Sequence, residues 1–134
     1  MKGNNPGYLA DKLEQIHLIQ STVREPDWIK KLYLINPVKD TIPFLLYLKD
    51  GNPFYAHGNI GKRKGAECFS TPFFRIEELK DGYAILKLLK PSYFPDSNDQ
   101  SICNVCNLEK SAFCIDVDLE MFGAIQLFDT EIVC

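Results

Sequence analysis

Two Asp-Gly turns, each set between apolar runs of strand length, constrain the fold of this chain more than any other feature. The runs are residues 42–48 and 54–57 around Asp50-Gly51, and residues 73–79 and 83–89 around Asp81-Gly82. Asp-Gly between apolar segments is the strongest short-range signal for a β-hairpin, because glycine adopts the positive φ that tight turns need. The sequence therefore predicts two β-hairpins and a chain dominated by antiparallel strands.

The C-terminal third contains a further strand pattern. Cys114 and three carboxylates alternate with four apolar residues: Phe113, Ile115, Val117 and Leu119. This period of two predicts a strand with one buried face. Residues 124–128 are predicted to be its return partner, with Gly123 near the bend. Residues 91–100 contain two prolines, two serines and two aspartates, which predicts a long polar loop.

The N-terminal segment follows a helical pattern. Asn5-Pro6 is typical of a helix cap followed by proline at the first helical position. Apolar residues then recur at helical spacing: Leu9, Leu13, Ile16, Ile19 and Val23. An amphipathic helix is predicted over residues 7–24, and Glu25-Pro26 ends it because the residue before a proline is pushed out of the helical region. After it, one alternative is a short turn that carries Trp28, and the other is a strand at residues 32–35.

A single domain accounts for these elements, since 134 residues with 46% apolar content support one compact core. We divide it into an N-terminal helix and linker, residues 1–40, and a β domain, residues 41–134. The predicted fold class is mainly β: a small antiparallel β-sandwich or partly open barrel with one N-terminal amphipathic helix. The periodicity leaves open whether that helix packs on an edge or end of the sheet or protrudes as an arm.

Composition and charge narrow the function classes. The apolar runs are far shorter than the ~20 residues of a membrane-crossing helix, and residues 1–6 contain one basic residue and no apolar stretch. We therefore expect a soluble protein that is made in the cytosol and has no membrane partner. Residues 91–134 sum to −7 and residues 1–90 to +4. This asymmetry indicates complementary surfaces of an assembly, a basic surface for an acidic partner, or simply scattered surface charge. The acidic C-terminal third argues against nucleic-acid binding.

Five cysteines cannot all pair within one chain, so at least one thiol is free or crosslinks to another chain. Cys103-Asn104-Val105-Cys106 is the sharpest metal candidate, with Cys114, and then Cys68 or His57, as further zinc ligands. A structural zinc site usually shows two such pairs, and the two sulfurs would point to opposite faces if residues 102–108 formed a strand. We predict no metal and keep zinc at Cys103, Cys106 and Cys114 as the alternative.

No catalytic constellation is predicted. A cysteine nucleophile would need His17 or His57 beside it, and nothing local in the sequence activates either histidine. Residues 58–65 combine glycine with positive charge, but their spacing differs from that of a P-loop, so a basic loop tip is expected there. We therefore predict that the protein is not an enzyme and uses no cofactor.

Three motifs cover residues 41–134 in order. The first is Thr41-Ile42-Pro43-Phe44-Leu45-Leu46-Tyr47, followed by Gly51-Asn52-Pro53-Phe54-Tyr55-Ala56. The second is Ser70-Thr71-Pro72-Phe73-Phe74-Arg75-Ile76-Glu77-Glu78, followed by Ala84-Ile85-Leu86-Lys87-Leu88-Leu89. The third is Cys114-Ile115-Asp116-Val117-Asp118-Leu119, followed by Phe122-Gly123-Ala124-Ile125-Gln126. With these motifs the chain resembles the CotY/CotZ family of spore coat and exosporium proteins. The resemblance implies a cysteine-rich structural protein that self-assembles into extended, crosslinked sheets. This chain departs from the pattern at Met121, Gly123 and Leu127, in the segment where family members carry cysteines, which lowers the expected degree of disulfide crosslinking.

The resemblance implies a self-assembling structural component of the spore's outer layers, in the coat, crust or exosporium, made in the mother-cell cytoplasm. Its partners would be further copies of itself and other coat or exosporium proteins; a zinc-stabilised adaptor that anchors other coat proteins is the alternative. The crosslinking candidates are Cys68, Cys103, Cys106, Cys114 and Cys134. If Phe113 and Ile115 face the core, Cys114 faces outward. We expect disulfides to lock an assembly that non-covalent contacts have already built, once the reducing mother-cell cytosol is lost.

Overall fold

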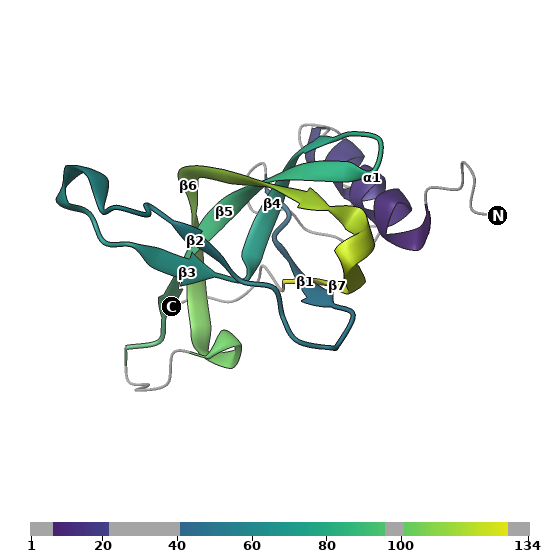
Figure 1. Cartoon of the computed structure of the whole chain (residues 1–134). Coiled ribbons are helices and arrows are strands. Elements are labelled where there is room, and N and C mark those ends of the chain that lie inside the picture. The colour runs from purple at the N-terminus through teal and green to yellow at the C-terminus, as the bar shows by residue number, and fades with distance from the viewer. Residues whose placement is uncertain (1–6, 22–40, 96–100, 129–134) are drawn as a thin grey trace.

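A curled sheet, a helix packed at one end and a two-stranded arm on the opposite side make up the structure, a computed structural model (Figure 1). It describes residues 7–21, 41–95 and 101–128. The elements, in chain order, are α1 (Gly7–Ser21), β1 (Phe44–Leu48), β2 (Ala56–Gly58), η1 (Arg63–Gly65), β3 (Phe69–Thr71), β4 (Phe73–Leu79), β5 (Tyr83–Tyr93), η2 (Ile102–Asn104), β6 (Val105–Asp118), η3 (Leu119–Met121) and β7 (Phe122–Leu127). The mainly β fold with one N-terminal helix is thus confirmed for the described residues.

Helix α1 packs on the sheet and does not protrude. Leu13, Ile16 and Ile19 lie on one of its faces and are buried, and the helix contacts β4 and β7. The described helix ends at Ser21, so its predicted continuation to residue 24, and both alternatives for the segment after it, lie outside the described residues. No helix in the described part of the chain is long and apolar enough to cross a membrane.

The second predicted hairpin is confirmed. Strands β4 and β5 pair as antiparallel neighbours. Asp81-Gly82 makes the turn between them, where the N–H of Lys80 donates to the carbonyl oxygen of Tyr83 at 2.9 Å and Gly82 has a φ of +90°. Glycine adopts that conformation without a steric penalty from Cβ, so Gly82 sets the register of two inner strands.

The first predicted hairpin is only half right. Strand β1 enters a turn at Asp50-Gly51, closed by a hydrogen bond of 2.8 Å from the N–H of Leu48 to the carbonyl oxygen of Asn52. The returning chain then makes a single bridge with β1, between Tyr47 and Pro53. One further hydrogen bond, of 2.9 Å from the N–H of Phe54 to the carbonyl oxygen of Leu46, follows this bridge, and the pairing ends there.

Phe54 shows what replaces the lost pairing. Its ring stacks on Phe74 and meets Phe122 edge-on, with centroid distances of 5.7 and 5.2 Å. Aromatic pairs at these separations add to the energy of burial. The chain therefore anchors Phe54 in the core and leaves the sheet, and β2 pairs with β3 instead of β1.

Strand β6 contains the predicted alternation, because Val117 is buried while Asp116 and Asp118 are exposed. The predicted return partner is wrong: β7 pairs with β1, with Phe44 opposite Leu127. The short turn η3 explains the difference. Asp118 caps it by accepting a hydrogen bond of 3.0 Å from the N–H of Glu120, and the turn carries the chain to the other edge of the sheet.

The sheet is curled because its two edge strands are close neighbours in sequence. The strand order is β6-β5-β4-β1-β7, so β6 and β7 lie at opposite edges. In a flat sheet these edges would be roughly 19 Å apart, whereas the chain from Asp118 to Phe122 spans at most about 14 Å. A curled sheet that does not close agrees with the predicted partly open barrel.

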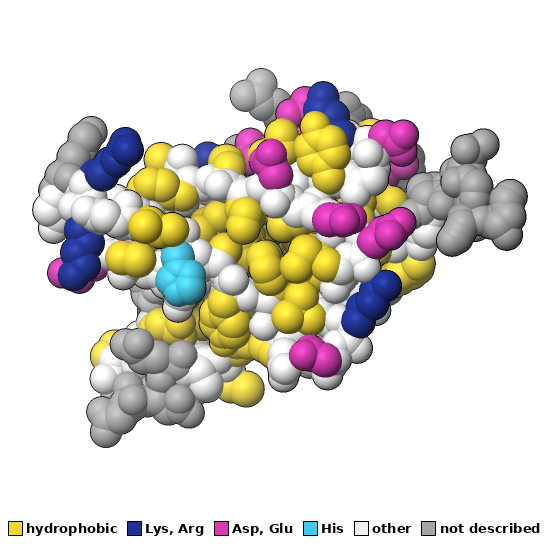
Figure 2. All heavy atoms as spheres, in the orientation of Figure 1, with side chains coloured by type: hydrophobic (Ala, Val, Ile, Leu, Met, Phe, Trp, Pro, Cys, Tyr) yellow, Lys and Arg dark blue, Asp and Glu magenta, His cyan; other side chains and the backbone are white. Residues whose placement is uncertain are grey.

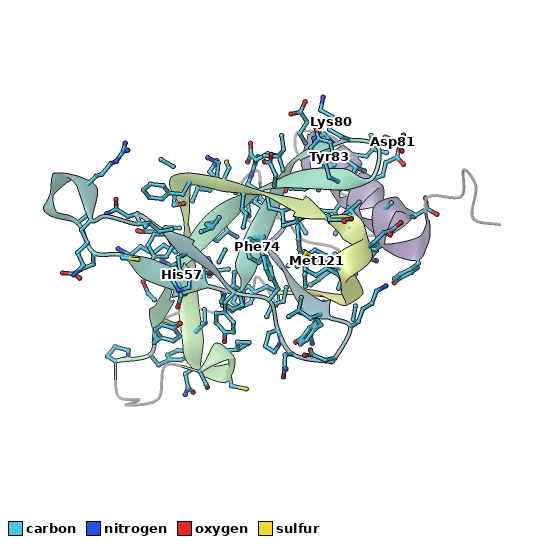
Figure 3. The ribbon with its side chains drawn as sticks, in the orientation of Figure 1. His57, Phe74, Lys80, Asp81, Tyr83 and Met121 are labelled. Atoms are coloured by element: carbon cyan, nitrogen blue, oxygen red, sulfur yellow. The ribbon has the colours of Figure 1, made fainter. Side chains whose placement is uncertain are left out.

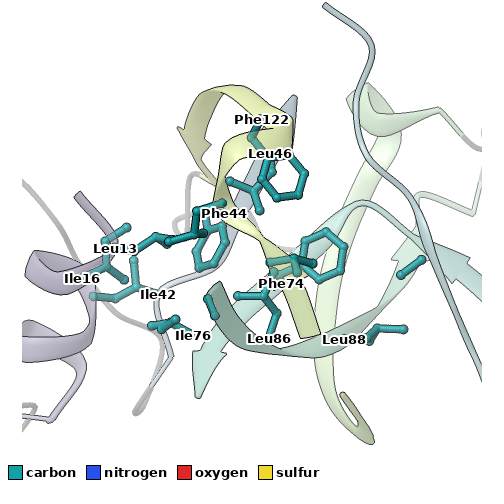
Figure 4. Packing of buried hydrophobic residues seen from close by; sticks show 14 of the residues in the cluster. Leu13, Ile16, Ile42, Phe44, Leu46, Phe74, Ile76, Leu86, Leu88 and Phe122 are labelled. Carbon is teal, nitrogen blue, oxygen red and sulfur yellow. The ribbon is translucent and has the colours of Figure 1, made fainter. Parts of the chain in front are cut away.

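Most of the core lies inside the curl, between the sheet and α1 (Figure 4). Its members include the following residues of α1, β1, β4, β5 and β7: Leu13, Ile16, Phe44, Leu46, Phe74, Ile76, Leu86, Leu88 and Phe122. A smaller cluster lies on the other face of the sheet, where Leu45, Phe73, Leu89 and Val105 are buried. Neighbours such as Phe73 and Phe74 point to opposite faces because side chains alternate along a strand.

Candidate assembly surfaces

The edges of the curled sheet are the first candidate surface. Among the described residues, β6 pairs only with β5, and β7 only with β1. Unpaired edges invite association, and proteins usually blunt them with charge, proline or bulges. Strand β6 is blunted by Lys110, Asp116, Asp118 and two register shifts against β5. Strand β7 contains neither charge nor proline, and its ladder with β1 is regular over residues 124–127.

The outer face of β6 carries the side chains that the sequence placed outward. Cys114, Asp116 and Asp118 are exposed and alternate with Ile115 and Val117, which are more buried. The outward orientation predicted for Cys114 is therefore confirmed. Its thiol is free, and it shares its face with two carboxylates.

The thiols fall into two groups. Cys103 and Cys114 are exposed and Cys68 is partly buried, and all three are free. Cys106 is 4% exposed and disulfide-bonded. Cys106 is one of the crosslinking candidates from the sequence, together with Cys103, and it lies buried at the start of β6. Cys134 lies outside the described residues.

The alternative zinc site is not assembled. Cys103 lies in η2 and Cys106 in β6, and the disulfide removes the Cys106 sulfur as a thiolate ligand. Within residues 7–21, 41–95 and 101–128, no group of three or more His, Cys, Asp or Glu side chains is placed to hold a metal ion. His57 is exposed on β2 (Figure 3), and His17 is partly buried on α1.

The arm, residues 56–71, is the second candidate surface and projects from the sheet (Figure 1). Its loop is the basic tip that the sequence predicted. Ile60 is 74% exposed, and Lys62 and Arg63 are exposed as well. The ammonium of Lys62 lies 3.8 Å from the carboxylate of Glu67, but both side chains are largely in solvent, where such a pair contributes little. Among its described side chains, the tip therefore presents Ile60, Lys62 and Arg63 to the solvent.

Asn59 holds this tip in one shape. Its side chain is buried, Nδ2 donates to the carbonyl oxygens of Ala66 and Glu67 at 3.1 and 3.4 Å, and Oδ1 accepts from the N–H of Arg63 at 3.1 Å. Asn59 and Lys62 have φ values of 56° and 54°, a left-handed conformation that costs about 1–2 kcal/mol for a residue with a Cβ. Sequence reasoning missed this role, although asparagine before a glycine-rich stretch is a known turn signal.

The base of the arm is fixed by Phe69. Its ring covers Gly58, where a Cβ would lie 2.4 Å from the ring, so only glycine fits. The same ring lies 6.2 Å from that of Phe113 on β6, and the ammonium of Lys90 sits 5.7 Å from its centre. These contacts attach the arm to β5 and β6.

The two ends of the molecule differ in their balance of charge. Figure 2 shows Lys and Arg side chains at the arm, while most acidic side chains of this face lie over the opposite half, with some Lys and Arg among them. Asp116, Asp118 and Glu120 are exposed and make no ion pair with any described residue. By contrast, Glu78 hydrogen-bonds and ion-pairs with Lys80 at 2.8 Å, which raises the pKa of Lys80.

Comparison with known proteins adds a family to this geometry. Residues 33–130 match the family model described as Spore coat protein Z. Spore coat protein Z of Bacillus subtilis (strain 168) is 33% identical over 134 aligned positions, which cover 93% of this chain and 90% of the relative. No solved structure matches. The family match spans every described strand and the arm, so it includes both candidate surfaces.

Proposed function

The chain belongs to the Spore coat protein Z family and is a structural component of the spore coat, and we propose that it builds this layer by associating with copies of itself through the edges of its sheet. The observation behind the proposal is β7, an edge strand without charge or proline in a sheet that curls but does not close. The free backbone groups of such an edge are satisfied when the edge of a second copy pairs with them.

Strand β7 is the better edge for this contact. If two β6 strands paired, the carboxylates of Asp116 and Asp118 would come close to those of the second copy, and like charges on neighbouring strands are destabilising. Two β7 strands bring no charges together. Their antiparallel pairing would relate the two copies by a two-fold axis, the commonest symmetry of protein dimers.

Disulfides come second in this proposal. Cys103 and Cys114 are exposed free thiols, and Cys68 is a partly buried one. In a reducing cytosol they stay reduced, so the first contacts are non-covalent. Oxidation then links thiols that assembly has already brought close, to other copies or to other coat proteins.

A charge at the β7 edge tests the proposed pairing. We expect Ala124→Lys, at an exposed position of β7, to reduce the size of the assemblies of reduced protein in sedimentation velocity. Ser92→Lys is the matched control, because Ser92 is an exposed strand residue that pairs with Asn107 of β6, away from the β7 edge. Equal assembly by both variants, with both folded by circular dichroism, would show that β7 is not the contact.

A variant that lacks the three free thiols tests the order of events. Cys68, Cys103 and Cys114 are changed to Ser, and Cys106 is left intact because it is disulfide-bonded. We expect the same assemblies as the parent forms, with lower resistance to denaturant after oxidation. If this variant is folded but monomeric while the oxidised parent assembles, covalent bonding initiates assembly and the order is wrong.

A further inference from the structure

The arm tip presents an apolar side chain in a preset shape. Ile60 is 74% exposed at the tip. The buried side chain of Asn59 fixes the loop below it by donating two hydrogen bonds and accepting a third. Lys62 is held in a left-handed conformation in the same loop. Strained conformations persist where the surrounding structure imposes them, and they concentrate at functional positions. A loop fixed in this way also loses little conformational entropy when Ile60 docks on another surface.

A matching surface lies on the outer face of β5, β6 and η3. We call it the counter-face, and its members are Tyr83, Ile85, Asp116, Asp118, Glu120 and Met121. Asp118 is opposite Tyr83 on the ladder, and Asp116 is opposite Ile85, so acidic and apolar side chains are neighbours. Tyr83 and Met121 are 40% and 38% exposed.

The arm tip and the counter-face lie at different ends of one molecule. Figure 3 labels Tyr83 and Met121 on the half of the protein that faces away from the arm, and Figure 1 shows the last part of β6 and η3 on that same side. The arm is also attached at its base by Phe69. One chain therefore cannot bring its own tip onto its own counter-face.

We propose that the arm tip of one copy docks on the counter-face of the next copy. Lys62 and Arg63 meet the three carboxylates of the counter-face, and Ile60 meets its apolar side chains. The inference rests on the proposed self-association and adds a second contact to it. Opposite potentials of this kind fix the register of a contact and exclude wrong partners.

Charge selects this counter-face over the solvent face of α1, another exposed apolar surface in the described chain. The solvent face of α1 displays Tyr8 and Leu18, which are 73% and 58% exposed. Within that helix, however, Lys12 offsets one of the two carboxylates, Asp11 and Glu14. The helix thus carries one net negative charge. Residues 116–120 carry three, and Lys80, which lies near Tyr83, is ion-paired with Glu78.

The contact is head-to-tail, which determines what it can build. A contact between two different surfaces repeats from copy to copy and gives a ring or an open filament. The β7 pairing proposed above is two-fold and crosses between such rows. Together the two contacts extend an assembly in more than one direction, which is what a coat layer needs.

Charge reversal tests the contact. The arm variant is Lys62→Glu with Arg63→Glu, and the face variant is Asp116→Lys with Asp118→Lys. Each makes tip and counter-face alike in sign, so we expect each alone to weaken association of reduced protein in low salt about tenfold or more, by sedimentation velocity. The control, Lys12→Glu with Gln15→Glu on α1, adds negative charge outside the arm and the β7 edge and should associate like the parent.

Mixing the two variants is the sharper measurement. The negative arm of one fits the positive counter-face of the other, and the reverse pair also fits, so an equimolar mixture should recover association. A mixture no better than its components, or variants that associate like the control, would overturn the arm contact alone. A parent protein that stays monomeric in the same buffer would overturn self-association itself.

A variant that leaves the charge of the protein unchanged tests the apolar part of the contact. Ile60→Ser removes the apolar tip at an exposed position and should weaken association several-fold, while Leu18→Ser on the exposed face of α1 should leave it unchanged. Circular dichroism and thermal melting check that both are folded. If these two variants associate equally well, the arm tip is not part of the contact, and the proposal is wrong.

Discussion

The Nε2 of Gln20 on α1 donates a hydrogen bond to the carbonyl oxygen of Ile76 on β4, 2.9 Å away. The Oε1 of the same side chain accepts from the N–H of Ile42, at 3.3 Å, just before β1 begins. Gln20 is 5% exposed, so a single buried amide joins the helix to β4 and to the segment that leads into β1. Buried polar groups are almost always paired in this way, and each pairing specifies one arrangement of the elements.

Gln20→Met should therefore destabilise the fold. The substitution keeps the size of the side chain but removes both hydrogen bonds from a buried site, so we expect a loss of about 1–3 kcal/mol in the free energy of unfolding. Urea unfolding followed by circular dichroism measures it. Gln15→Met, on the exposed face of the same helix, is the control and should change stability by less than about 0.5 kcal/mol. Equal effects would contradict a structural role for the Gln20 amide.

Thr71 should be similarly sensitive, at the point where the arm joins β4. Its buried hydroxyl donates to the carbonyl oxygen of Leu89 at 2.7 Å and accepts from the N–H of Phe73 at 3.1 Å. Thr71→Val preserves the shape and leaves these groups without the hydroxyl, with an expected loss of about 1–3 kcal/mol by urea unfolding. Ser70→Ala, at the exposed neighbour, should be close to neutral. A neutral Thr71→Val would show that the hydroxyl is dispensable.

The described cysteines should differ in reactivity. In the folded, unreduced protein, a thiol-alkylating reagent should modify Cys103 and Cys114 first and Cys68 more slowly, because the first two are exposed and the third is partly buried. Cys106 should react only after reduction. Peptide mass spectrometry at increasing reaction times gives the order. Early labelling of Cys106 would contradict its assignment to a disulfide.

Tyr93 should lose its proton later than an ordinary tyrosine. Burial, and then the neighbouring Tyr55, raise its pKa. The folded protein therefore holds this proton more tightly than the unfolded chain does. The stability that results is present below the ordinary pKa of tyrosine and is lost as the pH rises through the raised folded value. In a tyrosinate absorbance titration, Tyr93→Phe should remove the last phase. Loss of an earlier phase instead would contradict the raised pKa.

Local patterns in the sequence predicted the elements better than their partners. The Asp-Gly turn at Gly82, the helical spacing before Ser21 and the alternation around Val117 all depend on neighbours in the chain, and all three appear in the structure. The partners of β2 and β7 depend on distant residues. The packing of Phe54 on Phe74 determines the partner of β2, and the short turn after Asp118 determines the partner of β7. Neither feature can be predicted from the sequences of the two strands.

The same limit applies to the candidate surfaces: local features could be predicted from the sequence, and features set by distant residues could not. The period of two gave the outward direction of Cys114, because orientation along a strand is a local property. The burial of Cys106 was not predictable, since it depends on where β6 begins against β5. The role of Asn59 was also missed, because its three hydrogen-bond partners are set by the shape of the arm loop.

Self-association without covalent bonds is the central claim, and sedimentation velocity of the reduced protein over a range of concentrations tests it most directly. We expect species larger than the monomer to grow with concentration in low salt. They should weaken as salt approaches physiological strength, because exposed charges are then screened over ~8 Å. A protein that remains strictly monomeric at high concentration in low salt, while folded, would contradict the claim.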